Sequence, residues 1–410
     1  WDINVPWNRP EYTDKSTGEQ KYGANYVKYF NKAYMAMGYA MLFPTGKTTW
    51  NTLLKKPGQK EPKPVNDREY YRYLYQWRVN PNSGECINKT FWKMGKVVQQ
   101  SICDVSVRAD ERQLANLTSK RMQARIRSAP WAKICHAQSK RKASSIYIPR
   151  SFRGGQAHHY HEFQKAMACV NAVGKPDYFI TFTTNPHWKE IDEWVALGYD
   201  RALAEIRVFR CYFRRLMRDL QLGIMGVPLS LIASVEFQKK GAGHAHILLR
   251  VRHKDRPLTS KRVDRFVSAR IPADNPKTEV LRELVLKHQM HYFCGKHGSY
   301  RKCCYDGTTQ CRDYFPKDYN DHTDITPHQY PAYKRIHPNK GGEAVRRYVR
   351  LKPNDTTTHA QDQTDAWVVP YNPYILMRYR ATCNVEVCSS VEAVAYLYKY
   401  IFKGHDRQIL

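Results

Sequence analysis

The sequence predicts an α+β protein, and three stretches carry that prediction. Residues 234–249 alternate polar and apolar side chains on either side of a glycine-containing turn, which indicates two paired strands. Residues 199–222 place an apolar side chain at every third or fourth position, as a long amphipathic helix does. Residues 106–128 repeat this helical pattern among many basic side chains. Strands and helices are therefore both expected, in separate segments of one chain.

The composition indicates a nucleic-acid partner. Lysine and arginine number 67 against 37 acidic residues, which gives a formal net charge of +30. A charge of this size repels itself in a compact monomer unless a polyanion neutralises it. The chain has no apolar run of about 18 residues and no signal-peptide pattern, so we expect neither membrane insertion nor secretion. The 11 cysteines favour reduced thiols and metal ligands, and hence a reducing compartment.

A boundary between two domains is expected near residues 149–155, where proline and glycine interrupt the pattern. Residues 1–150 are predicted to form a basic, mainly helical region that grips DNA through its phosphates. Within this region, residues 67–78 are both aromatic and basic, and we favour an aromatic core with a solvated basic face over base stacking. Residues 151–410 are predicted to form the second domain, with a strand at 178–183.

The paired strands at 234–249 predict a metal site. His244 and His246 share a face because side chains alternate along a strand. Folding the chain back about residues 239–243 sets Gln238 opposite His244 and Glu236 opposite His246. We predict Gln238 as the third ligand because it adjoins the loop, with Glu236, the harder oxygen donor, as the alternative. Mg²⁺ or Mn²⁺ suits this set, although imidazoles also accept Zn²⁺.

Near the other end, residues 391–403 predict a helix that ends at Gly404. On such a helix Tyr396 and Tyr400 lie one turn apart on the same face, whereas Tyr398 is rotated by about 200°. Both features have a structural alternative. The chain contains 16 histidines and 29 tyrosines, so a single His-x-His and a tyrosine cluster can also be ordinary strand and core residues.

Five blocks resemble, in the same order, the Rep nuclease portion of Helitron transposases, which are two-tyrosine HUH nucleases acting on single-stranded DNA. The resemblance covers about the last 260 residues and reaches weakly into the first 150. The chain departs from the family at Gly241-Ala-Gly243, which is usually Gly-Leu-Pro, and at Ala395, which is commonly lysine. Neither change removes a chemical group that the reaction needs. The blocks are residues 178–191, 235–249, 369–374, 384–390 and 396–404.

The resemblance implies an HUH nuclease core in residues 151–410, with a central antiparallel sheet flanked by helices and an insertion at 255–366. It implies that Tyr396 or Tyr400 attacks a phosphodiester of single-stranded DNA, with the aid of the divalent cation, and forms a 5′-phosphotyrosine during rolling-circle transposition. Other residues are expected to contact the DNA or groups around the site; they are Thr183, Asn185, Lys399 and Lys403.

The insertion carries a candidate zinc knuckle within residues 288–317. Four ligands of the histidine and cysteine type suit a closed tetrahedral site. The resemblance favours Cys304 over its neighbour Cys303, because the block around Cys304 is similar to the cysteine block of the family. Buried free thiols are the structural alternative. The predicted ligands are His291, Cys294, Cys304 and Cys311, and the possible substitutes are His288, His297 and Cys303.

The expected partner is single-stranded DNA of transposon ends and target, with no small-molecule substrate, in the nucleus of a eukaryotic host. The oligomeric state stays open, and a monomer is the simplest expectation. Because the chain begins at Trp1, we expect it to be part of a longer protein, whose helicase, if it has one, would lie beyond residue 410. The alternatives are a rolling-circle replication initiator or relaxase, and a catalytically silent DNA-binding module.

Overall fold

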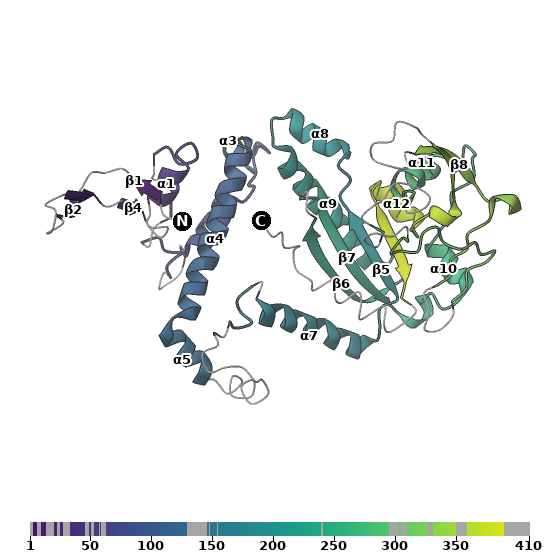
Figure 1. Ribbon diagram of the computed structural model, residues 1–410, viewed down its shortest axis with the longest axis horizontal. Coiled ribbons are helices and arrows are strands. Elements are labelled where there is room, and N and C mark those ends of the chain that lie inside the picture. The colour runs from purple at the N-terminus through teal and green to yellow at the C-terminus, as the bar shows by residue number, and fades with distance from the viewer. Residues whose placement is uncertain are drawn as a thin grey trace. The chain divides into compact units, whose positions relative to one another are not determined.

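The computed structural model divides the chain into two compact units, each of which is described by itself (Figure 1). Unit 1 comprises Trp1–Gly155 and Trp194–Leu203, and unit 2 comprises Gln156–Glu193 and Ala204–Leu410. The residues that the structure describes are 3–5, 10–13, 20–22, 25–27, 33–45, 49–50, 53–56, 58, 63–128, 146, 148–153, 155–238, 241–294, 303–304, 310–325, 331–349 and 359–388.

In its described part, unit 1 is mainly helical. Two short antiparallel pairs come first, β1 (Ile3–Val5) with β4 (Asn25–Val27) and β2 (Pro10–Thr13) with β3 (Gln20–Tyr22). The 23-residue helix α4 is the longest element of the unit, and it packs against α2. The helices are α1 (Tyr34–Gly38), α2 (Asp67–Leu74), α3 (Lys89–Lys93), α4 (Lys96–Thr118) and α5 (Lys120–Ser128).

The aromatic segment of α2 forms the core of unit 1. The helix begins at a capping box in which Asn66 and Glu69 bond each other's backbone N–H groups. Tyr71 and Tyr75 are buried one turn apart, and the Tyr75 hydroxyl donates to Ser101 of α4 at 2.9 Å. Tyr73 points the other way and is 58% exposed. The segment therefore forms an aromatic core with a solvated face, which is the alternative that we favoured from the sequence.

Unit 2 is built on a four-stranded antiparallel sheet in the order β10-β5-β7-β6, which confirms the α+β class (Figure 1). β6 and β7 form a hairpin, and β5 lies between β7 and the late strand β10. The strands are β5 (Tyr178–Thr183), β6 (Pro228–Phe237), β7 (Gly243–Val251) and β10 (Cys383–Val387), and the neighbouring helices are α7 (Gln156–Val173), α8 (Lys189–Ala196) and α9 (Arg201–Gln221).

One face of this sheet packs against α9. Ile180 and Phe182 of β5 and Ile247 of β7 have no exposed surface, and the Phe182 ring stacks on Phe209 of α9 at 5.9 Å. The helix lies so close that a β-carbon at Gly243 would come within 2.4 Å of the Phe209 ring. Glycine is therefore required where β7 begins, at the strand that carries both histidines of the predicted site.

The opposite face of the sheet is covered in part by α7. Ala166 of α7 packs with Leu248 of β7, and Phe179 of β5 and Ile232 of β6 are partly buried in the same cluster. Further along β5 and β7 the side chains of this face become polar, beginning with Thr181. The sheet thus has an apolar half beneath α7 and a polar half beyond it.

The predicted insertion folds around two buried charged residues, Arg335 and Asp365. Arg335 is 3% exposed, and its guanidinium donates to the carbonyl of Val368 at 2.8 Å. Asp365, which has no exposed surface, accepts from the backbone N–H groups of Ile271 and Ile336. These bonds join segments that are distant in the sequence. The elements here are α10 (Ser260–Phe266), α11 (Glu279–His288), β8 (Ala344–Val349), β9 (His359–Thr364), α12 (Pro373–Tyr379) and the 3₁₀ turns η1 (His253–Asp255), η3 (Pro338–Lys340) and η4 (Asp365–Trp367).

Among the helices that the structure describes, none combines the length and the apolar character needed to cross a bilayer.

Replacing Phe182 by alanine tests the packing between the sheet and α9. Because Phe182 is fully buried against Phe209 and Tyr379, we expect Phe182→Ala to lower the free energy of unfolding by about 3–5 kcal/mol. Urea denaturation measures this change. Leu222→Ala is the control, since Leu222 is 74% exposed and its loss should change the stability by less than about 0.5 kcal/mol. Equal effects of the two changes would contradict the packing described.

Candidate metal centres

The β6–β7 hairpin closes with a tighter turn than the sequence suggested. The backbone N–H of Gln238 donates to the carbonyl of Ala242 at 3.0 Å, and Gly241 has a φ of +81° that favours glycine. This turn places Glu236 opposite His244 and Ser234 opposite His246. The predicted register, with Gln238 opposite His244, is thus wrong by two residues. Because side chains alternate with a period of two, the same face still carries the polar groups.

Glu236 takes the place that the sequence analysis gave to Gln238. Its carboxylate Oε1 lies 3.2 Å from Nε2 of His246. The ring centroids of His244 and His246 are 4.6 Å apart. One donor atom from each of Glu236, His244 and His246 lies within 4.8 Å of the others. Donors that bind one cation at about 2.0–2.3 Å have such mutual separations. Gln238 is exposed at the turn. The residues present therefore fit a divalent cation with a carboxylate as the third ligand.

Two contacts hold the imidazoles in position. The Thr183 hydroxyl and Nδ1 of His244 share a hydrogen bond of 2.8 Å, which leaves Nε2 of His244 for a cation. The ring of His246 stacks on Phe179, with ring centres 5.8 Å apart and planes 7° apart. Both supporting residues lie on β5, next to β7 in the sheet. Sequence reasoning assigned neither of these contacts, because they depend on which strands pair.

The electrostatic environment keeps His244 neutral. Burial, together with the neighbouring His246, lowers the pKa of its imidazole from the ordinary 6.5 to about 4. A histidine must be neutral to bind a metal, so His244 is in its ligand form throughout the physiological pH range. The two imidazoles and one carboxylate fill only part of a cation's coordination shell, and the remaining positions suit phosphate oxygens.

Thr183 at the end of β5 and Asn185 two residues beyond it were expected to contact DNA or groups around the site, and they differ in their surroundings. Thr183 supports His244, as described above. Asn185 is 7% exposed; its amide donates to the carbonyl of Arg380 at 2.7 Å and accepts from the backbone of His187 at 2.9 Å. Its amide groups thus join the segment after β5 to the end of α12, and the expectation that Asn185 contacts DNA or groups around the site stays a prediction.

Residues 70–249 match a family model described as the Helitron helicase-like domain at the N-terminus. Over this span, the chain is similar to the Helitron family. The match confirms the resemblance drawn from residues 178–191 and 235–249, and it supports a Helitron transposase. No curated protein matches the chain. The Helitron span ends at Leu249 on β7, so it includes Glu236 and both histidines of the hairpin, whereas the cysteine cluster lies outside it.

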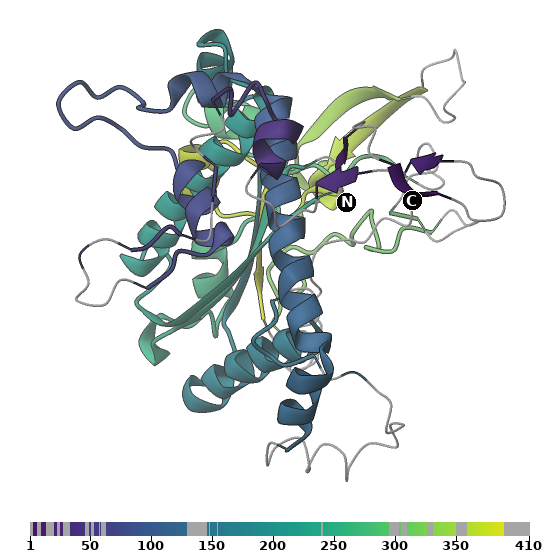
Figure 2. The ribbon, with the colours of Figure 1, turned by 90° about the vertical axis from the view of Figure 1, so that its left-hand side faces the viewer.

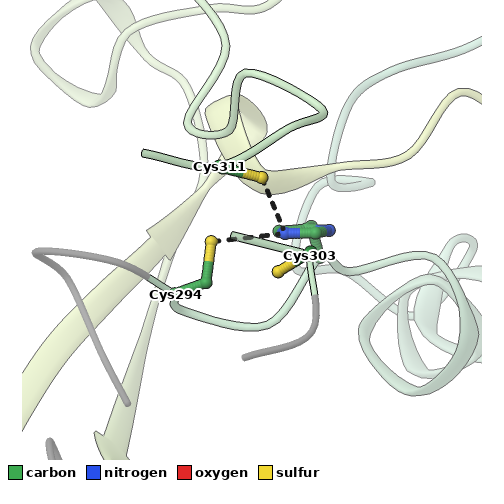
Figure 3. Close-up of side chains that lie close together, drawn as sticks. Cys294, Cys303 and Cys311 are labelled. Carbon is green, nitrogen blue, oxygen red and sulfur yellow. Dashed lines mark hydrogen bonds between the residues drawn. The ribbon is translucent and has the colours of Figure 1, made fainter. Parts of the chain in front are cut away.

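A second group of possible ligands lies in the insertion, outside the span similar to the Helitron family (Figure 3). Nε2 of His291 is 3.5 Å from the sulfur of Cys294 and 3.6 Å from that of Cys311. With Cys303 added, one donor atom from each residue lies within 4.8 Å of the others. Ligands arranged tetrahedrally about a zinc-sized ion are separated by about 3.5–4 Å, so the four residues fit such an ion.

The structure places Cys303, and not Cys304, in this group. Cys304 pairs through its backbone with Cys311, and neighbouring side chains of an extended segment point in opposite directions. Only one of the two adjacent thiols can therefore face His291. Burial raises the pKa of the Cys303 thiol to about 11, so the sulfur is protonated until a cation displaces the proton. His297, a possible substitute, lies outside the described residues.

The predicted tyrosine helix of the Helitron resemblance also falls outside the part of the chain that the structure describes. Tyr396, Lys399, Tyr400 and Lys403 all belong to residues 389–410. Their roles stay predictions from the sequence.

The choice of Glu236 over Gln238 can be tested by Mn²⁺ titration. We expect Glu236→Ala to weaken Mn²⁺ binding at the hairpin by at least about tenfold, because it removes the only carboxylate among the three ligands. Gln238→Ala is the matched control on the same strand end and should change the affinity by less than about twofold. Electron paramagnetic resonance of free Mn²⁺ gives both affinities. Loss of binding in Gln238→Ala alone would restore the register predicted from the sequence.

The adjacent cysteines offer a second matched pair. Because Cys303 faces His291, we expect Cys303→Ser to remove most of the metal that remains with the chain after dialysis, while Cys304→Ser retains it. Elemental mass spectrometry counts the metal per chain. The reverse outcome would show that Cys304 is the ligand. Equal retention by both variants, with Cys294→Ser also retaining metal, would rule out the cluster as a metal centre.

Proposed function

We propose that this chain is the endonuclease part of a Helitron transposase, which nicks single-stranded DNA and transfers the strand through a 5′-phosphotyrosine. The observation that carries the proposal is the group of Glu236, His244 and His246 on the polar half of the sheet, within the span matched by the Helitron family. A silent DNA-binding module has no need for a neutral buried histidine held next to a carboxylate.

The proposed reaction begins with DNA bound over the hairpin. A cation held by the three ligands, Mg²⁺ or Mn²⁺, would neutralise charge on the scissile phosphate. His244 and His246 contribute nitrogen donors, and Thr183 keeps the His244 ring in the orientation that a ligand requires. The carboxylate of Glu236 adds the negative charge that favours a hard divalent ion over a neutral ligand set.

The phenol of Tyr396 or Tyr400 would then attack the phosphorus. A bond forms between the phenol oxygen and phosphorus, the bond to the 3′-oxygen breaks, and the phenol proton ends on the released 3′-hydroxyl. The reverse reaction with another 3′-hydroxyl joins the strand to new DNA without ATP. Two tyrosines a turn apart can hold two strands, and Lys399 and Lys403 are proposed to bind the phosphates beside them.

The connection from the sheet is long enough for this step. β10 ends at Val387, beside Tyr178 of β5, and Tyr396 follows nine positions later in the sequence. Thr183, next to His244, lies five positions along β5 from Tyr178, a distance of about 17 Å. Nine residues span about 14 Å as a helix and about 30 Å when extended. Tyr396 can therefore reach the hairpin when part of the connection is extended, and Tyr400, four residues further on, needs less extension.

The remaining features fit the same proposal. The net charge of +30 suits a DNA partner. We propose that zinc occupies the group formed by His291, Cys294, Cys303 and Cys311 and has a structural role, since thiolates and imidazole are its usual structural ligands. Transposition requires access to chromosomal DNA, so a nuclear location is part of the proposal.

Covalent capture of DNA tests the nuclease. We expect the chain, with Mn²⁺ and labelled single-stranded DNA from the element's ends, to form an adduct that survives denaturation. The double variant Tyr396→Phe/Tyr400→Phe should form none, because phenylalanine lacks the attacking oxygen. His244→Ala should reduce the adduct by about 100-fold or more. Tyr398→Phe is the matched control and should form it normally, since Tyr398 faces another direction on the predicted helix.

Two outcomes would contradict the proposal. One is the absence of any adduct from the wild-type chain with DNA of its own element. The other is an adduct that persists in the double tyrosine variant. Comparing the two single variants identifies which tyrosine acts on which strand.

A further inference from the structure

The two-stranded ribbon of β8 and β9 is firmly anchored at one end. Val345 packs against the buried cluster that contains Ile271 and Val368. Thr364 and Tyr319 share a hydroxyl hydrogen bond of 2.8 Å, and Gln363 is 5% exposed. This end of the ribbon, where β8 begins and β9 ends, is therefore part of the folded core of unit 2.

The other end of the ribbon is in solvent. Figure 2 shows the yellow-green strands extending away from the rest of unit 2. Arg346, Arg347 and Tyr348 are exposed, and Tyr348 is 72% exposed, more than any other tyrosine in the described part of the chain. Tyr348 lies opposite Ala360, whose methyl group covers little of the ring. One aromatic face is therefore open.

The outer half of the ribbon is not explained by a contribution to the stability of the fold. Two strands that no third strand or helix covers are marginally stable in water, and among the residues that the structure describes this outer half belongs to no buried apolar cluster. Its side chains are nevertheless large, and they combine an aromatic ring with positive charge. The residues between the strands, which lie outside the described part, add Arg350 and Lys352 to the sequence of the ribbon.

The arrangement of these side chains fits single-stranded DNA. Arg346 and Tyr348 are two positions apart on β8, so they share a face and lie about 7 Å apart. Arg346 pairs with Asp362 at 2.7 Å, but both side chains are largely exposed, and an exposed ion pair is weak enough to give way to a phosphate. Arg347 points to the other face, where its Nε donates to Gln363 at 3.3 Å.

We propose that the β8–β9 ribbon is a nucleic-acid-binding arm, in which Tyr348 stacks on a base of single-stranded DNA and Arg346 and Arg347 contact the phosphates. Stacking on an aromatic ring tolerates any base and needs an unstacked strand, whereas duplex DNA has its bases stacked on one another. The ribbon would hold the DNA outside the hairpin site and so limit diffusion of the strand during cleavage. The choice of DNA as the partner rests on the proposed function.

Equilibrium binding without added Mg²⁺ or Mn²⁺ tests the arm, because no cleavage is then needed. The full chain is titrated onto fluorescently labelled oligothymidylate and onto a duplex of equal length, and anisotropy gives the dissociation constants. We expect Tyr348→Ala to weaken single-strand binding by about 5- to 50-fold. Tyr348→Phe keeps the ring and should bind within about twofold of wild type. Arg346→Ala/Arg347→Ala should weaken binding and lower its dependence on salt.

Controls separate the arm from general charge effects. Arg214→Ala removes an exposed positive charge from α9 in the same unit, and it should leave single-strand binding within about twofold of wild type. If Tyr348→Ala binds single strands like wild type, or if Arg214→Ala weakens binding as much as the ribbon variants, the arm is refuted. Weaker binding of Tyr348→Ala to duplex only would refute the single-strand assignment.

The adduct assay keeps this proposal distinct from the nuclease proposal. A chain that forms no adduct but binds DNA through Tyr348 would contradict the nuclease and support the arm. A chain that forms the adduct and binds DNA equally well without Tyr348 would support the nuclease and contradict the arm. Because Tyr348 is exposed, its replacement should not change the thermal unfolding of the chain, which circular dichroism measures.

Discussion

The burial of one side of β7 is the constraint on which the candidate cation site depends. Ala245, Ile247 and Leu249 have no exposed surface, and they lie on the face of the sheet that packs against α9. A strand whose odd-numbered residues are fixed in this way must turn its even-numbered residues to the other side. His244 and His246 therefore share the opposite face whatever the surroundings. A shift of one residue would move three apolar side chains away from α9 and turn two imidazoles into the apolar packing against that helix, which makes this orientation strongly preferred.

The same alternation explains how far the sequence could predict the site. It identified the face of β7 that carries the histidines, and that prediction needs no tertiary structure. Alternation could not choose between Glu236 and Gln238, because the two residues are two positions apart and therefore lie on the same face of the strand. The turn decides between them, through the positive φ of Gly241 and the bond that closes the hairpin at Gln238. Alternation also implies that only one of Cys303 and Cys304 can face His291, without saying which.

Sequence patterns could not predict contacts between distant segments. The bond from Thr183 to His244 joins residues 61 positions apart, and it exists because β5 pairs with β7 rather than with a strand nearer in the chain. Asn185 illustrates the opposite case. A polar residue at the end of a strand near a proposed active site resembles a ligand-binding group, but its amide is used to join β5 to α12. The aromatic segment of α2 was predicted well, because a helical spacing of tyrosines already separates buried from solvated positions.

The position of β6 at the rim of the sheet has a consequence for heat sensitivity. β7 is held by neighbours on both sides, whereas β6 has β7 as its only partner in the described sheet. A rim strand can detach locally at a lower free-energy cost than the whole unit needs to unfold. Detachment of β6 would carry Glu236 away while both imidazoles stay in place. A bound cation would thus be released on warming before the helices melt, and the same ion, by bridging β6 and β7, would hold this edge strand to the sheet.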